Sequence, residues 1–325
     1  MAPVREVTVL GAGGTIAMAG EGAALPSLDA AALVAAVPPL AGVPGLRARS
    51  IGDWPGVHVS AADALAIARA AVAEAAGGRG VVLTHGTDTL EETAVLCHLL
   101  HGADAPIVVT GAIRPASAAG ADGPANLLDA VRAAGDAACS GLGAIVAFAG
   151  ELHAAQAVRK SDSVSPRAFS SPRGGPIGRV SEQCVEVWAM PARRPPLPVA
   201  QLDARVEIVA AGLGSDGALV EAALAAGADG LVAVLLGAGH APPFYLAACR
   251  AAAARVPVVA CVRPEAGRML RETYGFAGAE RDVRAAGLMP APALSPAAAR
   301  ITLMACIGAG YSRVATAAAF AASDP

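Results

Sequence analysis

The chain has 325 residues, which is enough for two domains and a large core. Apolar residues make up 55% of it but aromatic residues only 3%, so the core is expected to consist of alanine, valine, leucine and isoleucine. The net charge is −3, and acidic and basic residues are spread along the chain without a basic stripe, which argues against nucleic acid as a partner.

The N-terminus and the cysteines predict the compartment. The first residues run directly into a predicted strand at 6–10, without a basic leader, so we expect no secretory signal. No apolar run is long enough to span a bilayer. The six cysteines are scattered without CxxC or metal-ligand spacing, and we expect them to be reduced and mostly buried. These features predict a cytoplasmic protein without a membrane partner, a metal or a cofactor.

Apolar segments alternate with helical patterns along the first 190 residues. Strands are expected at 6–10, 47–51, 81–84, 106–110 and 143–148, and helices at 28–37, 61–76, 90–100 and 125–134. Ser27, Ser60 and Asp122 precede three of these helices as start signals. The segment 20–26 has no apolar periodicity and is expected to be a mobile loop. The alternation of strand and helix predicts a parallel sheet.

A segment rich in proline, glycine and arginine, 173–198, separates this part of the chain from the rest. It contains an expected strand at 184–188, and 191–204 reads as a linker. Beyond it, strands are expected at 206–210, 230–236 and 257–262, helices at 217–226, 243–254 and 296–308, and a loop at 273–282. The predicted fold is α/β, with a larger N-terminal doubly wound sheet domain (1–190) and a smaller C-terminal α/β domain (205–325).

The segment 81–93 (VVLTHGTDTLEET) consists of a short apolar strand, a polar turn and the start of a helix. A buried parallel strand that ends in small hydroxyl and carboxyl residues is where an open α/β sheet places its ligand. Gly86 permits close approach of another backbone. Asp88 and Thr89 could instead cap the helix, whose first turn carries Glu91 and Glu92. This segment alone leaves both interpretations open.

A second polar turn, GAGGTIA at 11–17, follows the first strand. Its glycines are similar to a dinucleotide-binding loop, but the third glycine and the later acidic residue of that motif are missing, so nucleotide binding is the weaker hypothesis. The alternative is a turn that directs Thr15 into a cleft. Lys160 is the only lysine of the chain, which, unless it stands there by chance, indicates chemistry that arginine cannot perform.

Thr15, Thr87, Asp88 and Lys160 follow predicted strands, and we expect them to converge at one edge of the sheet. A threonine hydroxyl is a poor nucleophile that needs an adjacent base. A desolvated Lys160 would take a proton from Thr87, while Asp88 would hold the resulting ammonium group. Backbone amides near Gly86 and Ala112 would donate hydrogen bonds to an oxyanion.

Four motifs resemble those of the bacterial-type L-asparaginase/glutaminase family. They are GGTIA at 13–17, THGTDTLEET at 84–93, GAIRP at 111–115 with ADGPANL at 121–127, and VRK at 158–160. The resemblance extends over essentially the whole chain, including 274–276. It implies hydrolysis of L-asparagine to L-aspartate and ammonia without a cofactor. It also implies a homotetramer whose active sites lie between the subunits of an intimate dimer.

The resemblance implies roles for individual residues as well. Thr15 matches the nucleophile that forms an acyl-enzyme, and Thr87, Asp88 and Lys160 match a second catalytic group in which Asp88 also binds the α-amino group of the substrate. The remaining positions that are expected to bind substrate are Gly56, Val57, His58, Gly86, Ala112 and Glu280. Glu280 would reach the α-amino group from the neighbouring subunit.

Several positions depart from the family pattern. Gly56 stands where the family usually has a serine that binds the α-carboxylate, and Val57 and His58 replace more polar residues. The family lid usually carries a tyrosine that activates the first threonine, but no tyrosine precedes Tyr245, and Glu21 is the only ionisable residue of that loop. His240 stands where an asparagine is often found.

These departures leave other functions open. Glutamine or another ω-amide is one alternative substrate, and a diverged binder of a small amino acid with weak or no activity is a second possibility. An amidase subunit that feeds ammonia to a reaction on tRNA is a third. The lack of an appended nucleic-acid-binding domain argues against it.

Overall fold

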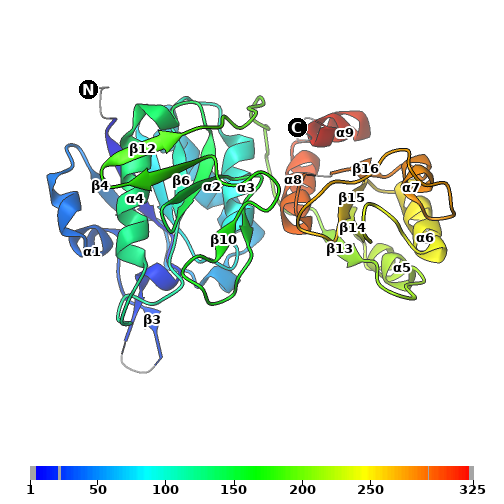
Figure 1. Cartoon of the computed structure of the whole chain (residues 1–325), viewed down its shortest axis with the longest axis horizontal. Coiled ribbons are helices and arrows are strands. Elements are labelled where there is room, and N and C mark those ends of the chain that lie inside the picture. The colour runs from blue at the N-terminus through cyan, green and yellow to red at the C-terminus, as the bar shows by residue number, and fades with distance from the viewer. Residues whose placement is uncertain (1–4, 21–22, 292, 322–325) are drawn as a thin grey trace. The chain divides into compact units, whose positions relative to one another are not determined.

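The computed structural model describes residues 5–20, 23–291 and 293–321, and the chain divides between Pro196 and Leu197 into two compact units (Figure 1). This division lies inside the segment 191–204. Glu21 lies outside the described residues. Within the described part of the chain, no helix has the length and apolar character that a membrane crossing requires.

An eight-stranded sheet forms the centre of the first unit, in the order β12-β11-β8-β7-β6-β5-β1-β4. Its parallel part consists of β1 (Val7–Gly11), β4 (Arg47–Ser50), β5 (Gly80–Thr84), β6 (Ile107–Thr110) and β7 (Ala144–Phe148). Antiparallel pairing adds β8 (Glu151–Ala154), β11 (Gly178–Ser181) and β12 (Cys184–Val187). The β-branched runs of the central strands are buried on both faces, as in other sheets covered by helices.

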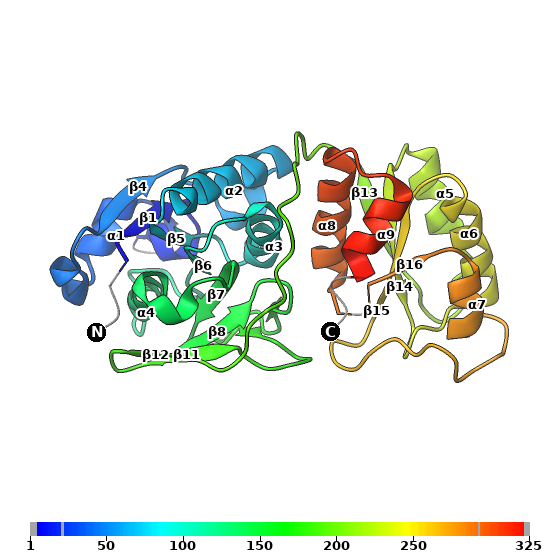
Figure 2. The same ribbon diagram turned by 90° about the horizontal axis from the view of Figure 1, so that it is seen from above.

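Helices cover both faces of this sheet (Figure 2). The helices α2 (Ala61–Ala76) and α3 (Leu90–Leu100) pack together on one face, and α1 (Ala30–Ala35) and α4 (Gly123–Gly135) lie on the other. Leu33 of α1 and Leu127 of α4 share one apolar core with Val9 and Val82. The mixed architecture with helices on both faces confirms the predicted α/β class.

The connection through α4 differs in hand from its neighbours. The chain moves in the same direction along the sheet from β5 through α3 to β6 and from β6 through α4 to β7, yet α3 and α4 cover opposite faces. These two crossovers therefore have opposite hands, although such connections are right-handed in about 98% of cases. The sequence did not predict this feature.

Local boundaries follow the capping residues. Ser60 caps α2 in a reciprocal pair with Asp63, as expected. The expected start of the first helix at Ser27 is wrong, because Asp29 caps α1 by accepting a hydrogen bond from the Ala32 amide at 2.7 Å. The segment 20–26 is not wholly a loop, because β3 (Leu25–Pro26) pairs with β2 (Met18–Ala19).

Short elements complete the first unit. Four 3-10 helices are present among the described residues: η1 (Thr15–Ala17), η2 (Pro38–Gly42), η3 (Gly56–His58) and η4 (Ala137–Cys139). A separate ribbon pairs β9 (Arg159–Lys160) with β10 (Phe169–Ser170). The residue Lys160 therefore belongs to this ribbon and does not directly follow a strand of the main sheet.

The second unit contains a four-stranded parallel sheet in chain order, with α8 (Pro296–Gly308) against it and α5 (Ala218–Ala225) paired with α6 (Pro243–Ala253). Its strands are β13 (Val206–Ala210), β14 (Gly230–Leu235), β15 (Val258–Val262) and β16 (Met289–Pro290). The expected loop at 273–282 is wrong at its end, because α7 (Glu280–Ala285) begins there. The helix α9 (Arg313–Ala321) and the strand β16 were not expected from the sequence.

Candidate active site

The turn after β5 carries Thr87 and Asp88, and both side chains contact Lys160. The Lys160 Nζ donates a hydrogen bond to Thr87 Oγ1 at 2.9 Å and another to Asp88 Oδ1 at 2.8 Å. Thr87 is buried, whereas the side chains of Asp88 and Lys160 are 54% and 21% exposed. Three of the four residues predicted to be catalytic therefore form one hydrogen-bonded group at the edge of the protein surface.

Lys160 is held in place through its backbone. Its amide N–H donates to Glu91 Oε2 in the first turn of α3 at 2.9 Å, and its strand pairs with β10 at Phe169. The Phe169 ring packs on Phe148 at the end of β7, with 4.7 Å between the centroids. Glu91 was expected only to suit the helix dipole. Its contact with Lys160 depends on a return of the chain that has no local sequence signal.

The alternative interpretation of the turn as a helix cap is right for the position of Thr89 but not for a capping bond by its side chain. Thr89 is the N-cap residue of α3, but its side chain makes no capping hydrogen bond. The Thr89 hydroxyl donates instead to the Gly56 carbonyl at 2.8 Å, and the Asp88 carboxylate is engaged by Lys160. Both polar side chains connect the turn to other segments of the site.

Three loops of the first unit meet at Gly14, Gly56 and Gly86. Gly14 has φ +83°, and a Cβ atom on it would lie 2.3 Å from the Gly86 nitrogen. A Cβ atom on Gly86 would lie 2.5 Å from Gly56 Cα. Only residues without a side chain allow backbones to approach this closely. This junction places Thr15, the first residue of η1, beside the turn that carries Thr87. Among the described residues, no hydrogen-bond partner engages the Thr15 hydroxyl.

The same packing gives a physical reason for glycine at position 56. A Cβ atom there would lie 3.1 Å from Gly86 Cα, which is tighter than most real contacts, so a serine would require a small shift of the loops. Gly56 is buried in η3. Val57 is 68% exposed and His58 is also exposed, so the two residues that follow do not pack into the junction.

Ala112 lies in the segment after β6, which packs against the Thr87 turn. A Cβ atom on Gly111 would lie 2.6 Å from the His85 carbonyl oxygen and 3.3 Å from Thr87 Cγ2. Ala112 itself is fully buried. Its backbone therefore lies within the same cluster of loops as Thr87 and Thr15.

His85 fills the space beneath the turn. It is fully buried, with Nδ1 donating to the Gly86 carbonyl at 2.9 Å and Nε2 accepting from the Thr93 hydroxyl at 3.2 Å. Burial lowers the pKa of His85, which favours the neutral ring, in which Nε2 accepts the hydrogen bond from Thr93. No role was predicted for His85 from the sequence, and its two buried hydrogen bonds stabilise the turn.

Glu280 belongs to the second unit, whereas the other predicted site residues belong to the first. It is fully buried, with Oε1 accepting from the Tyr274 amide at 2.6 Å and Oε2 lying 3.3 Å from His240 Nε2. Desolvation acts to raise the pKa of Glu280, but hydrogen bonds from backbone amides and the nearby His240 ring outweigh it, so this pKa lies below its usual value. The carboxylate is therefore charged at neutral pH.

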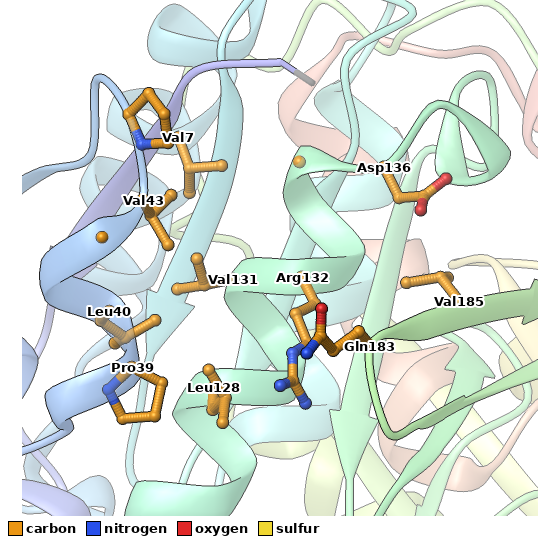
Figure 3. A pocket seen from close by; sticks show the side chains of 13 residues that line it. Val7, Pro39, Leu40, Val43, Leu128, Val131, Arg132, Asp136, Gln183 and Val185 are labelled. Carbon is orange, nitrogen blue, oxygen red and sulfur yellow. The ribbon is translucent and has the colours of Figure 1, made fainter. Parts of the chain in front are cut away.

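A cavity of about 400 Å³ lies elsewhere in the first unit, between η2, α4 and β12 (Figure 3). Val7 lines it at the beginning of β1, whereas Thr15 follows the other end of that strand. Its remaining walls are largely apolar and include Leu40, Val131 and Val185. None of the predicted site residues lines this cavity, so we do not assign the site to it.

Both units match known protein families. Residues 6–193 match the family described as "Asparaginase, N-terminal" and residues 205–320 match the "Glutaminase/Asparaginase C-terminal domain". The chain is 37% identical to a "Probable L-asparaginase" from Deinococcus radiodurans, over 96% of each chain. It is 36% identical to a "Glutaminase-asparaginase" from Pseudomonas fluorescens, over 59% of this chain and 55% of that protein.

The fold agrees with these matches. A crystal structure described as a probable cytoplasmic L-asparaginase from Campylobacter jejuni aligns with a TM-score of 0.86 and 27% identity, over 98% of this chain and 99% of that one. Both family matches lie on the two units that the structure separates. The chain belongs to the asparaginase family, as its motifs predicted.

Proposed function

We propose that the protein hydrolyses the side-chain amide of L-asparagine to L-aspartate and ammonia, with Thr15 as the nucleophile. The observation that carries this proposal is the Lys160 ammonium group within hydrogen-bond distance of both Thr87 and Asp88. A hydroxyl, an amine and a carboxylate in this order form a path along which a proton can move. The glycine junction beside Thr15 and membership of the asparaginase family support the same assignment.

The reaction takes place in two halves. In the first, Thr15 Oγ1 attacks the carbonyl carbon of the side-chain amide, the carbon–nitrogen bond breaks, and the hydroxyl proton leaves on the nitrogen as ammonia. In the second, water attacks the resulting ester, its hydroxyl completes the aspartate carboxyl group, and its remaining proton returns to Thr15. Both nucleophiles are weak at neutral pH, so each half needs a group that accepts and returns a proton.

Lys160, Thr87 and Asp88 serve as this group. Lys160 takes a proton through Thr87, and Asp88 stabilises the ammonium form that results. Thr87 also orients the attacking water. Backbone amides near Gly86 and Ala112 donate hydrogen bonds to the oxyanion of each tetrahedral intermediate. Their rigid setting supports this role, because both residues are buried in the cluster of loops.

The substrate's amino-acid end is held by Asp88, by the backbone at Gly56 and by Glu280 of a neighbouring copy. We propose a homotetramer of intimate dimers for this reason. Large apolar side chains after β14 and β15 support an interface on the second unit, since Phe244, Tyr274 and Phe276 are 77%, 45% and 53% exposed. Size-exclusion chromatography with light scattering should give a mass four times that of one chain. A fully active monomer would contradict this assembly.

We place the protein in the cytoplasm. The six cysteines are free thiols in the structure, and five of them are buried. The similar Campylobacter jejuni protein is itself described as a probable cytoplasmic enzyme. Disulfides are rare in a reducing compartment, so free cysteines are consistent with this location.

The decisive experiment is ammonia release by purified protein from L-asparagine and from L-glutamine. We expect turnover of asparagine and slower turnover of glutamine. No ammonia from either amide, together with a rise in melting temperature on adding aspartate, would indicate a diverged amino-acid binder. The absence of a tyrosine before Tyr245 is the sequence feature that favours this second candidate.

A further inference from the structure

Asn126 is the only asparagine in the chain, as Lys160 is its only lysine. It lies near the start of α4, the helix of the opposite-handed crossover, and is 2% exposed. A buried primary amide is costly unless its donors and its acceptor are all used. The surroundings of this side chain therefore indicate what it holds in place.

The Asn126 amide joins the ends of two neighbouring strands. Its Nδ2 donates to the Gly111 carbonyl at 3.0 Å and to Asp122 Oδ2 at 3.2 Å, and its Oδ1 accepts from the Ala149 amide at 3.0 Å. Gly111 follows β6 and Ala149 follows β7. One side chain thus bridges both strands at the edge of the sheet where the candidate site lies.

Asp122 extends this bridge along the segment after β6. Its carboxylate accepts hydrogen bonds from the Ile113 amide at 3.0 Å and from the Arg114 amide at 2.8 Å. The segment 111–114 is therefore held on both sides of Ala112. Asn126 in turn fixes the carboxylate, because its Nδ2 bonds to the same oxygen that accepts from Ile113.

The held segment lies between the two threonine turns. On one side Gly111 packs against Thr87 Cγ2 and the His85 carbonyl, as described above. On the other side, a Cβ atom on Gly123 would lie 2.9 Å from Ile16 Cγ1 and 3.4 Å from Ala112 Cβ. Ile16 is the neighbour of Thr15. A shift of this segment would change the spacing of both turns.

The bridge holds Ala149 in a backbone conformation that a residue with a side chain disfavours. Its φ of +50° is unusual for a residue with a side chain. Such a conformation persists where the surrounding contacts determine it. The hydrogen bond from its amide to Asn126 Oδ1 is one of those contacts.

We propose that Asn126 is a positioning residue of the amide hydrolysis, which fixes the backbone of 111–114 against the Thr87 turn. This inference rests on the proposed function. Aspartate cannot replace it, because a carboxylate has no donor for Gly111 and would add a second negative charge beside Asp122. Alanine would leave the Gly111 carbonyl and the Ala149 amide without this partner.

Kinetics of Asn126→Ala test the proposal. We expect kcat to fall by about 100-fold, since misplacing a reacting group by about 1 Å has an effect of this order, with KM changed by less than about threefold. His101→Ala is the matched control, because His101 is also buried and bonds a backbone carbonyl, that of Ala105 at 2.8 Å, but before β6 begins. It should lower the melting temperature and leave kcat unchanged.

Amide hydrogen exchange at 111–115 supplies a readout that does not depend on activity. We expect exchange to accelerate there in Asn126→Ala and to stay as in the parent protein in His101→Ala. Unchanged kcat or unchanged exchange would overturn the proposal, and a parent protein without amidase activity would refute the proposed function alone. If Asn126→Ala does not fold, Asp122→Ala should lower kcat by about tenfold, and wild-type kcat in that variant would overturn the proposal as well.

Discussion

Replacement of Lys160 by methionine removes the amine and keeps a flexible side chain of similar length. The substitution removes two hydrogen bonds, one to Thr87 Oγ1 and one to Asp88 Oδ1. The effect on folding should be small, because an ion pair this exposed contributes about 0–1 kcal/mol to the free energy of unfolding. The melting temperature is therefore expected to change little.

The effect on catalysis should be large. Positioned acid–base groups accelerate reactions by about 10²–10⁴-fold, which corresponds to about 3–5 kcal/mol of the activation free energy. Lys160→Met is expected to lower kcat by that factor, with a smaller change in KM. Lys160→Arg should be similarly inactive, because a guanidinium group keeps its charge but cannot take up and release a proton at neutral pH.

Ammonia release from asparagine measures the effect in each variant. Arg179→Met is the matched control, because Arg179 forms an exposed ion pair with Glu186 at 3.0 Å on a strand away from the candidate site. It should keep the parent kcat. Wild-type turnover in Lys160→Met, or full activity in Lys160→Arg, would refute the proton-transfer role.

Three further predictions concern other parts of the first unit. Thr15→Ala should abolish acyl-enzyme formation, seen as the loss of the ester adduct in the mass spectrum, and Thr87→Val should lower kcat by about 10²–10³-fold; normal turnover in either variant would contradict its role. Glu91→Ala, which frees the Lys160 amide, should lower kcat by about tenfold, while Glu91→Gln keeps an acceptor and should retain activity. Burial and nearby arginines lower the pKa of His98 to about 4, so the free energy of unfolding should fall by about 3 kcal/mol between pH 6.5 and pH 4 through this residue. Urea denaturation of His98→Gln should show a weaker loss over that range, and an identical pH profile would refute this account.

The sequence predicted most of the elements because each depends on neighbouring residues. The helix α2 has a capping box at Ser60 and an alanine-rich face, and the central strands are runs of β-branched residues between turns. The two threonine motifs could be placed at strand ends for the same reason. Their meeting in space follows from a rule of parallel sheets, which place the carboxyl ends of their strands at one edge.

Other features depend on contacts between distant segments, and the sequence did not predict them. The hand of the α4 crossover has no local pattern, and neither does the bond from Glu91 to the Lys160 amide. The start of α1 was misplaced because both Ser27 and Asp29 are good caps, and only the packed structure decides between them. The end of the loop at 273–282 was misplaced because α7 begins with Glu280, whose carboxylate lies 3.3 Å from His240 in a distant segment.

Residue types that the chain uses only once provide a link between composition and chemistry. The chain is rich in arginine and alanine and contains lysine and asparagine only once each, and at both positions the chemistry of the site gives a reason for the residue type. At 160, arginine has the charge but cannot release a proton. At 126, aspartate has the shape but no donor, and glutamine has the donor but a longer stem than the contacts to Gly111 and Ala149 allow. In both positions the requirement is a hydrogen-bonding pattern at fixed reach: Lys160 bonds to Thr87 itself, and Asn126 bonds to Gly111, which packs against Thr87.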